Sequence, residues 1–135
     1  MQVRYAMSLS DTPRLERSTR QRAAIRDAIE QAGRPLLAQE VLELACRHVP
    51  RLGIATVYRN IKAMMEEGTI KQVLLPGENP RFELAGHDHH HHFQCNRCQK
   101  VFDIHSCPSD LMSLAPKGFK VESHDLTLYG RCKDC

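Results

Sequence analysis

The segment ATVYRNIKAMMEEG, residues 55–68, decides the fold of the first part of the chain. Its apolar side chains recur at the spacing of one helix face: Val57, Ile61, Met64 and Met65. Gly68 then supplies the left-handed conformation that commonly ends a helix. The spacing therefore predicts an amphipathic helix from Ala55 to Glu67.

Two further amphipathic helices precede this segment. The first is expected to begin near Ser18 and to stop at Gly33, with a buried face made of Ile25, Ala28, Ile29 and Ala32. The second follows Pro35 and ends before Pro50, with a common face made of Leu37, Val41, Leu44, Ala45 and His48.

A hairpin is expected after the third helix. Residues 70–75 and 81–84 are short strand candidates, and residues 76–80, PGENP, have turn chemistry at nearly every position. Three helices followed by a hairpin form the element order of a winged helix-turn-helix domain.

The exposed face of the third helix suits a DNA major groove. At about 100° per residue it carries Ala55, Arg59 and Lys62, with Tyr58 at its edge. Arginine can donate two hydrogen bonds to a guanine edge, tyrosine can pack on a thymine methyl group, and lysine can hold a phosphate. The alternative is a half-buried Tyr58 beside two solvated cations. The winged-helix order favours DNA contact.

Basic residues are concentrated at the start of the chain. The formal net charge of the 135 residues is +3, and residues 1–26 hold six arginines against Asp11 and Glu16. Such an arm suits nucleic acid, although a solvated surface is the alternative. Arg20 and Arg22 are the candidate phosphate or minor-groove contacts.

The composition describes an ordinary globular chain of one or two small domains, with 41% hydrophobic and 26% charged residues. No apolar run approaches the ~20 residues that span a bilayer, and the opening MQVRYAMSLS lacks the apolar core of a secretory signal. We therefore expect a cytoplasmic protein with no membrane partner. In a reducing compartment, paired cysteines indicate metal ligands.

Two C-x-x-C pairs lie in the last part of the chain: Cys95 with Cys98, and Cys132 with Cys135. Together they predict one closed four-thiolate zinc site, and a pair of redox dithiols is the alternative. The part after Gly86 has only about fifty residues, and a core that small rarely holds together without such a staple.

The other elements of the last part are less regular. Strand-like segments at 93–94, 101–104 and 119–129 surround a short helical candidate at 109–114. Cys107 is expected to be a buried residue before that helix, with an oxidisable thiol as the alternative. Cys46 is expected to be a packed small hydrophobe.

Five histidines and an aspartate stand directly before the first cysteine pair, in GHDHHHHFQC, residues 86–95. In an extended strand, alternate histidines project from opposite sides, so two ion sites could share the segment. The available further ligands are Glu83, Asp103, His105, Asp110 and His124. Imidazole and carboxylate ligands suit zinc, iron, manganese or nickel.

The motifs ATVYRN, HHHHFQCxxC and SHDLTLYGRCxxC together resemble the ferric uptake regulator family of metal-responsive repressors, from roughly Arg17 to Cys135. The resemblance implies an α+β fold, with a winged helix-turn-helix domain and a small α/β zinc-bound dimerisation domain. We expect these at residues 1–84 and 92–135, with a hinge at 85–91. It implies a homodimer, no enzyme activity, and an inverted-repeat DNA operator.

The same resemblance implies three ligand sets. The structural zinc would be held by Cys95, Cys98, Cys132 and Cys135. A regulatory metal between the domains would be held by Glu83, His90, His92 and Asp103. A regulatory metal within the dimerisation domain would be held by His89, His91, Asp110 and His124. The resemblance further implies that the recognition helix would contact DNA through Tyr58 and Arg59.

Two departures from the family pattern bear on the regulatory metal. Residues 34–37 lack a histidine that many members place there, so His87 or Asp88 is the candidate replacement. Residues 82–84 lack the cysteine of zinc-sensing members, and Glu83 stands where peroxide-sensing members tend to have aspartate. Iron(II) is the favoured regulatory metal, with zinc and manganese as alternatives.

Two functions of other classes stay open at this stage. A zinc-dependent hydrolase would need an open coordination position and a positioned carboxylate base, and the chain has no HExxH helix. A histidine-rich metal buffer would need neither Tyr58 and Arg59 nor a folded winged helix.

Overall fold

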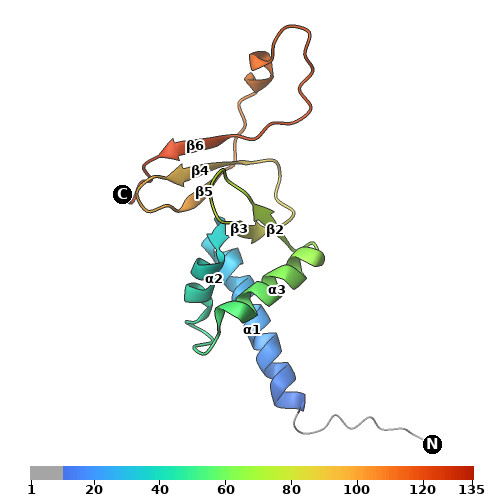
Figure 1. Ribbon diagram of the computed structural model, residues 1–135, viewed down its shortest axis with the longest axis vertical. Coiled ribbons are helices and arrows are strands. Elements are labelled where there is room, and N and C mark those ends of the chain that lie inside the picture. Colours follow the sequence, from blue (N-terminus) through green and yellow to red (C-terminus); the bar gives the residue numbers. More distant parts are fainter. Residues whose placement is uncertain (1–10) are drawn as a thin grey trace, which may run out of the picture.

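A computed structural model describes residues 11–135, with side chains from Arg14 onward. Arg4 of the expected basic arm lies outside the described residues. The molecule is elongated, with helices at one end, two small sheets in the middle and a projecting segment at the other end (Figure 1). Within the described chain, we find no helix with the length and apolarity needed to cross a bilayer.

The helical end has the winged helix-turn-helix order. Its elements are α1 (Asp11–Ala32), β1 (Leu36–Leu37), α2 (Ala38–Ala45), α3 (Ile54–Glu66), β2 (Ile70–Val73) and β3 (Arg81–Leu84). The three strands form one antiparallel sheet in the order β1-β3-β2. We call the β2–β3 hairpin the wing. The α+β class and the winged-helix order predicted from the sequence are confirmed.

The helix bounds differ most from the expected ones in α1 and α2, whereas those of α3 shift by one residue. Helix α1 begins at Asp11 rather than near Ser18, and Pro13 is tolerated there because first-turn N–H groups have no partner within the helix. Helix α2 ends at Ala45, and the chain then turns. His48, which was expected on the common face of this helix, lies beyond its end and is exposed.

One apolar core joins the three helices to the sheet. Its members include Ile25 of α1, Val41 of α2, Val57 of α3 and Phe82 of β3. Val57 is 0% exposed while its neighbour Tyr58 is 55% exposed, so the core turns one face of α3 inward and leaves the predicted DNA-contacting face free. Cys46 packs against this core, as predicted.

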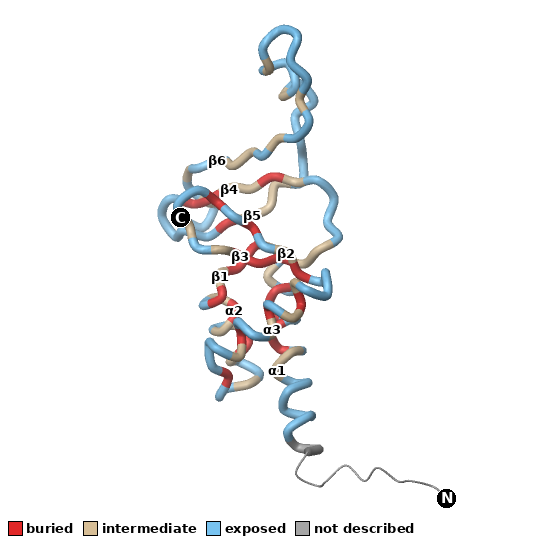
Figure 2. The backbone as a smooth tube through the Cα atoms, turned by 45° about the vertical axis from the view of Figure 1, so that its right-hand side comes forward, coloured by how far each residue is buried: buried red, intermediate tan, exposed pale blue. Residues whose placement is uncertain are grey.

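The second sheet contains β4 (His91–Cys95), β5 (Val101–Ile104) and β6 (Thr127–Gly130) in the order β5-β4-β6. Strand β4 pairs antiparallel with β5 and parallel with β6. The expected strand at 119–129 is observed only from Thr127, because the preceding residues from 105 onward form a segment that projects away from the sheet (Figure 1). Most of this projecting segment is exposed (Figure 2).

A short 3-10 helix, η1 (Leu111–Leu114), takes the place of the helix expected at 109–114. The prediction that Cys107 is buried is also wrong, because it lies in the projecting segment and is exposed. Strand β4 begins at His91, which is the last residue of the expected hinge at 85–91.

Candidate metal centres and DNA-facing surface

Four cysteine sulfurs meet at one end of the second sheet. Cys95 ends β4, Cys98 lies in the turn after it, and Cys132 and Cys135 follow β6. Because β6 pairs parallel with β4, with Gly130 opposite Cys95, the two cysteine pairs arrive at the same end. The four sulfurs lie within 4.8 Å of one another. The structure therefore brings together the predicted structural zinc ligands.

Hydrogen bonds prepare this cluster for a cation. The backbone N–H groups of Arg97, Cys98 and Cys132 each donate to the Cys95 sulfur at 3.4 Å. These contacts, with that of Cys98 the largest, lower the pKa of Cys95 to about 6. The hydrogen bond with Cys132 is the main cause that raises the pKa of Cys135 to about 12. Four neighbouring thiolates repel one another, so the thiols do not all ionise without a cation. A zinc ion would offset this repulsion.

A second cluster joins the wing to the second sheet. Glu83 comes from β3, His90 and His92 from the chain entering and forming β4, and Asp103 from β5, directly opposite His92. The His90 Nε2 atom lies 3.0 Å from a Glu83 oxygen, and both histidine Nε2 atoms lie 3.4 Å from Asp103 Oδ1. One ligand atom from each of the four residues lies within 4.8 Å of the others. We call this group the interdomain centre.

The interdomain centre fits a divalent cation. The Nε2 atom of His92 and the Oδ1 atom of Asp103 are buried and make no hydrogen bond. Burial lowers the pKa of His92, and burial followed by the Glu83 charge raises the pKa of Asp103. A bound cation would partner these atoms and offset the cost of placing two carboxylates together.

Backbone and cross-strand contacts orient these ligands. The Nδ1 atom of His90 lies 2.9 Å from the Asp88 carbonyl oxygen, which leaves Nε2 free to bind a metal. Lys71 lies opposite Glu83 in the wing, and its Nζ atom is 3.3 Å from a Glu83 oxygen. Lys71 was not expected at this centre from the sequence. The predicted hairpin could have indicated it, because Lys71 and Glu83 lie on its two facing strands.

The candidates for the missing family ligand lie close to the interdomain centre but outside its ligand group. The His87 ring lies 5.9 Å from the His90 ring between centroids, and the His105 ring lies at the same distance. Asp88 contributes its carbonyl oxygen to His90. Neither His87 nor Asp88 joins the four-residue group.

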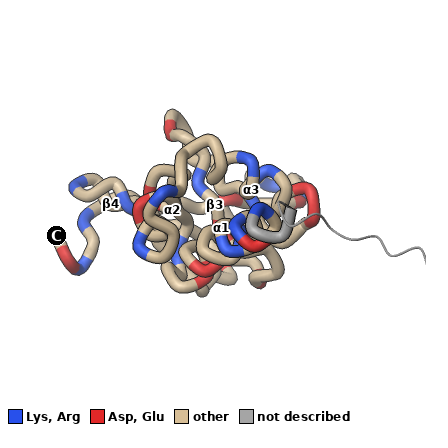
Figure 3. The backbone as a smooth tube through the Cα atoms, turned by 90° about the horizontal axis from the view of Figure 1, so that it is seen from below, with Lys and Arg blue, Asp and Glu red and all other residues tan. Residues whose placement is uncertain are grey.

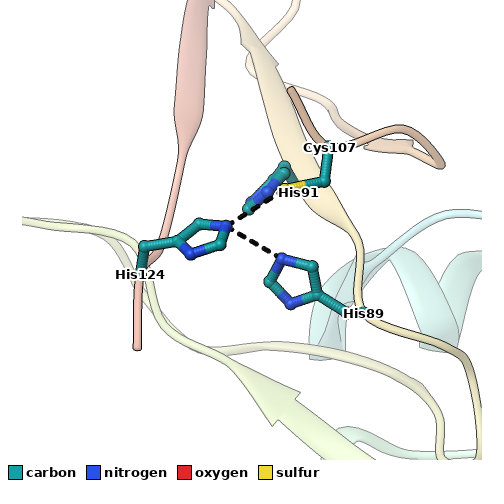
Figure 4. Close-up of side chains that lie close together, drawn as sticks. All are labelled: His89, His91, Cys107 and His124. Carbon is teal, nitrogen blue, oxygen red and sulfur yellow. Dashed lines mark hydrogen bonds between the residues drawn. The ribbon is translucent and has the colours of Figure 1, made fainter. Parts of the chain in front are cut away.

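A third cluster contains His89, His91, Cys107 and His124 (Figure 4). The His124 Nε2 atom lies 3.0 Å from His89 Nε2 and 3.1 Å from the Cys107 sulfur. Burial lowers the pKa of His91, which favours the neutral imidazole that binds metals. The expected ligand Asp110 is not part of this group. Its place is taken by Cys107, which lies three residues before Asp110 in the segment that follows β5. This sulfur was missed from the sequence because only histidine and carboxylate side chains were considered as further ligands of the histidine cluster.

The DNA-facing side chains lie at the helical end. Tyr58, Arg59 and Lys62 are exposed on α3, and Arg59 also lines a hollow between α1 and α3 together with Arg14 and Arg17. Seen from this end, Lys and Arg positions lie along both helices (Figure 3). The two arginines proposed from the basic arm differ: Arg20 is exposed, whereas Arg22 forms a two-pronged ion pair with Glu67.

Similarity to known proteins agrees with these features. A family model described as the ferric uptake regulator family matches residues 15–129. The peroxide operon regulator of Bacillus subtilis is 30% identical over 122 residues, covering 88% of this chain and 83% of that protein. The peroxide-responsive repressor of Staphylococcus saprophyticus is 29% identical, covering 88% and 82%.

Solved structures share the fold. The iron-containing ferric uptake regulator of Francisella tularensis is 26% identical with a TM-score of 0.65, covering 85% of this chain and 90% of that one. A zinc-bound manganese uptake regulator, 24% identical, has a TM-score of 0.72 over 87% and 97% of the two chains, and this likeness concerns the fold alone. This chain belongs to the ferric uptake regulator family of metal-responsive transcriptional regulators.

Proposed function

We propose that this protein is a homodimeric repressor whose DNA binding is switched on when the interdomain centre holds a divalent metal, with iron(II) favoured over zinc and manganese. The observation that carries the proposal is the convergence of Glu83 from the wing with His90, His92 and Asp103 from the second sheet, with ligand atoms within 4.8 Å. A transcriptional regulator of this kind needs no catalytic residue.

The placement of the ligands supports a switch. Glu83 lies in the wing, which belongs to the winged-helix half. His92 and Asp103 lie opposite each other in the second sheet. Side chains that hold one ion from both sides fix the angle between the two parts. Since a ligand shifts an equilibrium only toward the arrangement that it binds more tightly, this centre selects one spacing of the recognition helices in the dimer.

The exposed face of α3 supports operator recognition. A two-fold dimer presents its two recognition helices symmetrically, so the operator is an imperfect inverted repeat. Tyr58 and Arg59 read base edges, while Lys62 and Arg20 hold phosphates. We do not assign Arg22 to DNA, because Glu67 neutralises its charge.

The donor set supports iron(II) without selecting it alone. Two imidazoles with two carboxylates suit iron, manganese and zinc. The centre contains no sulfur ligand, which removes the main preference for zinc. The similar protein from Francisella tularensis was solved with iron.

The experiment measures operator binding by the full-length protein at buffered concentrations of Fe²⁺, Mn²⁺ and Zn²⁺. We expect metal-dependent binding that is lost in His92→Ala and retained in the control His105→Ala, whose ring lies near the centre but outside it. The four-cysteine zinc should remain bound in both variants. Equal affinity for the operator with and without added metal would overturn the switch.

Peroxide sensing is a second candidate, favoured by the 30% identity to the peroxide operon regulator of Bacillus subtilis. In that case hydrogen peroxide should release the iron-loaded protein from its operator and leave the manganese-loaded protein bound. Cys46→Ser is the control, since it removes a thiol that lies outside all three ligand clusters. Equal resistance of the iron and manganese forms would exclude this function.

A further inference from the structure

The third cluster has a different chemical character from the interdomain centre. Its ligand atoms are three imidazole nitrogens, from His89, His91 and His124, and the sulfur of Cys107. The side chains come from three separate segments and point toward one another (Figure 4). His91 is 1% exposed, and its Nε2 atom is buried without a hydrogen-bond partner.

The spacing of these atoms matches a four-coordinate ion. Tetrahedral zinc with ordinary bond lengths places nitrogen and sulfur ligands roughly 3.3–3.8 Å apart. Here the His124 Nε2 atom lies 3.0 Å from one ligand atom and 3.1 Å from another, and all four lie within 4.8 Å. Small movements of side chains would bring the four to the tetrahedral distances.

We propose that Cys107 is the fourth ligand of a closed three-imidazole, one-thiolate zinc centre, in the place that the family resemblance gives to a carboxylate. A thiolate shifts the preference of the centre toward zinc and away from manganese, which favours oxygen ligands. With four protein ligands the ion has no open position, so the centre is structural. This proposal does not depend on the interdomain centre, which uses none of the same residues.

The position of the ligands shows what the centre would do. Cys107 follows the end of β5, His124 precedes the start of β6, and His91 is the first residue of β4. Binding one ion would tie both ends of the projecting segment to the second sheet. This restricts a stretch whose Leu114 and Phe119 side chains are 79% and 72% exposed, because closing the base of a loop reduces its conformational freedom.

Cobalt(II) gives a direct test, since its bonds to thiolates absorb in the near ultraviolet whereas bonds to imidazole and carboxylate do not. The full-length protein, with zinc in the four-cysteine centre, is titrated with Co²⁺ without oxygen. The interdomain centre is silent in this band because it has no sulfur ligand. We expect the thiolate band in the parent protein and in the control Cys46→Ser, and its loss in Cys107→Ser and Cys107→Asp.

A competition with Zn²⁺ completes the test. Losing a direct ligand in Cys107→Ser should weaken zinc binding at least as much as losing an outer partner of a ligand, roughly 10–100-fold. Both variants should fold, since Cys107 is exposed, and circular dichroism checks this. An unchanged thiolate band or an unchanged zinc affinity in Cys107→Ser would overturn the proposal.

Discussion

The two halves of the molecule are stabilised in different ways. The winged-helix half contains a cluster of 14 buried residues drawn from its three helices, its sheet and the loop before α3. Beyond residue 85, the buried apolar side chains in the described chain are those of Cys95 and Val101. Burial of apolar surface can hold the first half together, whereas the second half has too little of it. We therefore expect metal binding in the second half to contribute to its folding as well as to regulation.

The largest expected effect comes from removing the four-cysteine zinc. Structural zinc contributes up to about 10–16 kcal/mol to the folding of small zinc domains, so Cys98→Ser should unfold the second half and abolish dimers. Zinc content, sedimentation and thermal unfolding measure this. The helical signal of the first half should persist, and Cys46→Ser is the matched control. A zinc-free variant that stays a dimer of parental thermal stability would break the comparison.

A core substitution in the first half should have the next largest effect. Ile61 is 2% exposed at the centre of the α3 face, so Ile61→Ala should lower the free energy of unfolding by about 2–5 kcal/mol. Denaturant unfolding followed by circular dichroism measures the loss. Zinc content should stay at the parental value, and loss of zinc together with stability would show that the two halves fold as one unit.

DNA contacts should change binding without changing either mode of stabilisation. Arg59→Ala should cost about 1–3 kcal/mol at the base pair that it reads and relax the preference there. Lys62→Ala should weaken all sequences alike and flatten the salt dependence. Binding to operator and scrambled DNA across a salt series distinguishes the two. If Arg59→Ala lowers both affinities equally, Arg59 contacts phosphate instead.

The smallest effect is expected at the surface of the first half. The Arg22–Glu67 pair is exposed, so Glu67→Gln should change the free energy of unfolding by about 0–1 kcal/mol and less at high salt. Thermal unfolding at two salt concentrations measures this. A loss as large as that of Ile61→Ala would mean that charge pairs, and not the apolar core, hold α1 against α3.

The sequence determined the features that depend on local periodicity and short spacing. The repeat of Val57, Ile61 and Met64 was sufficient to orient α3, because a helix repeats every 3.6 residues. The alternation of His89 to His92 separated two groups of ligands, because strand side chains alternate between faces. The C-x-x-C spacing likewise predicted the cluster of four cysteine sulfurs that the structure shows.

Only the tertiary structure decided which distant residues meet. Cys107 rather than Asp110 reaches His124 because the chain leaves β5 and projects before it returns as β6. Arg22 reaches Glu67 because α1 packs against the end of α3, and Lys71 reaches Glu83 through the register of the wing. These contacts depend on loop paths, strand register and helix packing, and local periodicity carries no information about them.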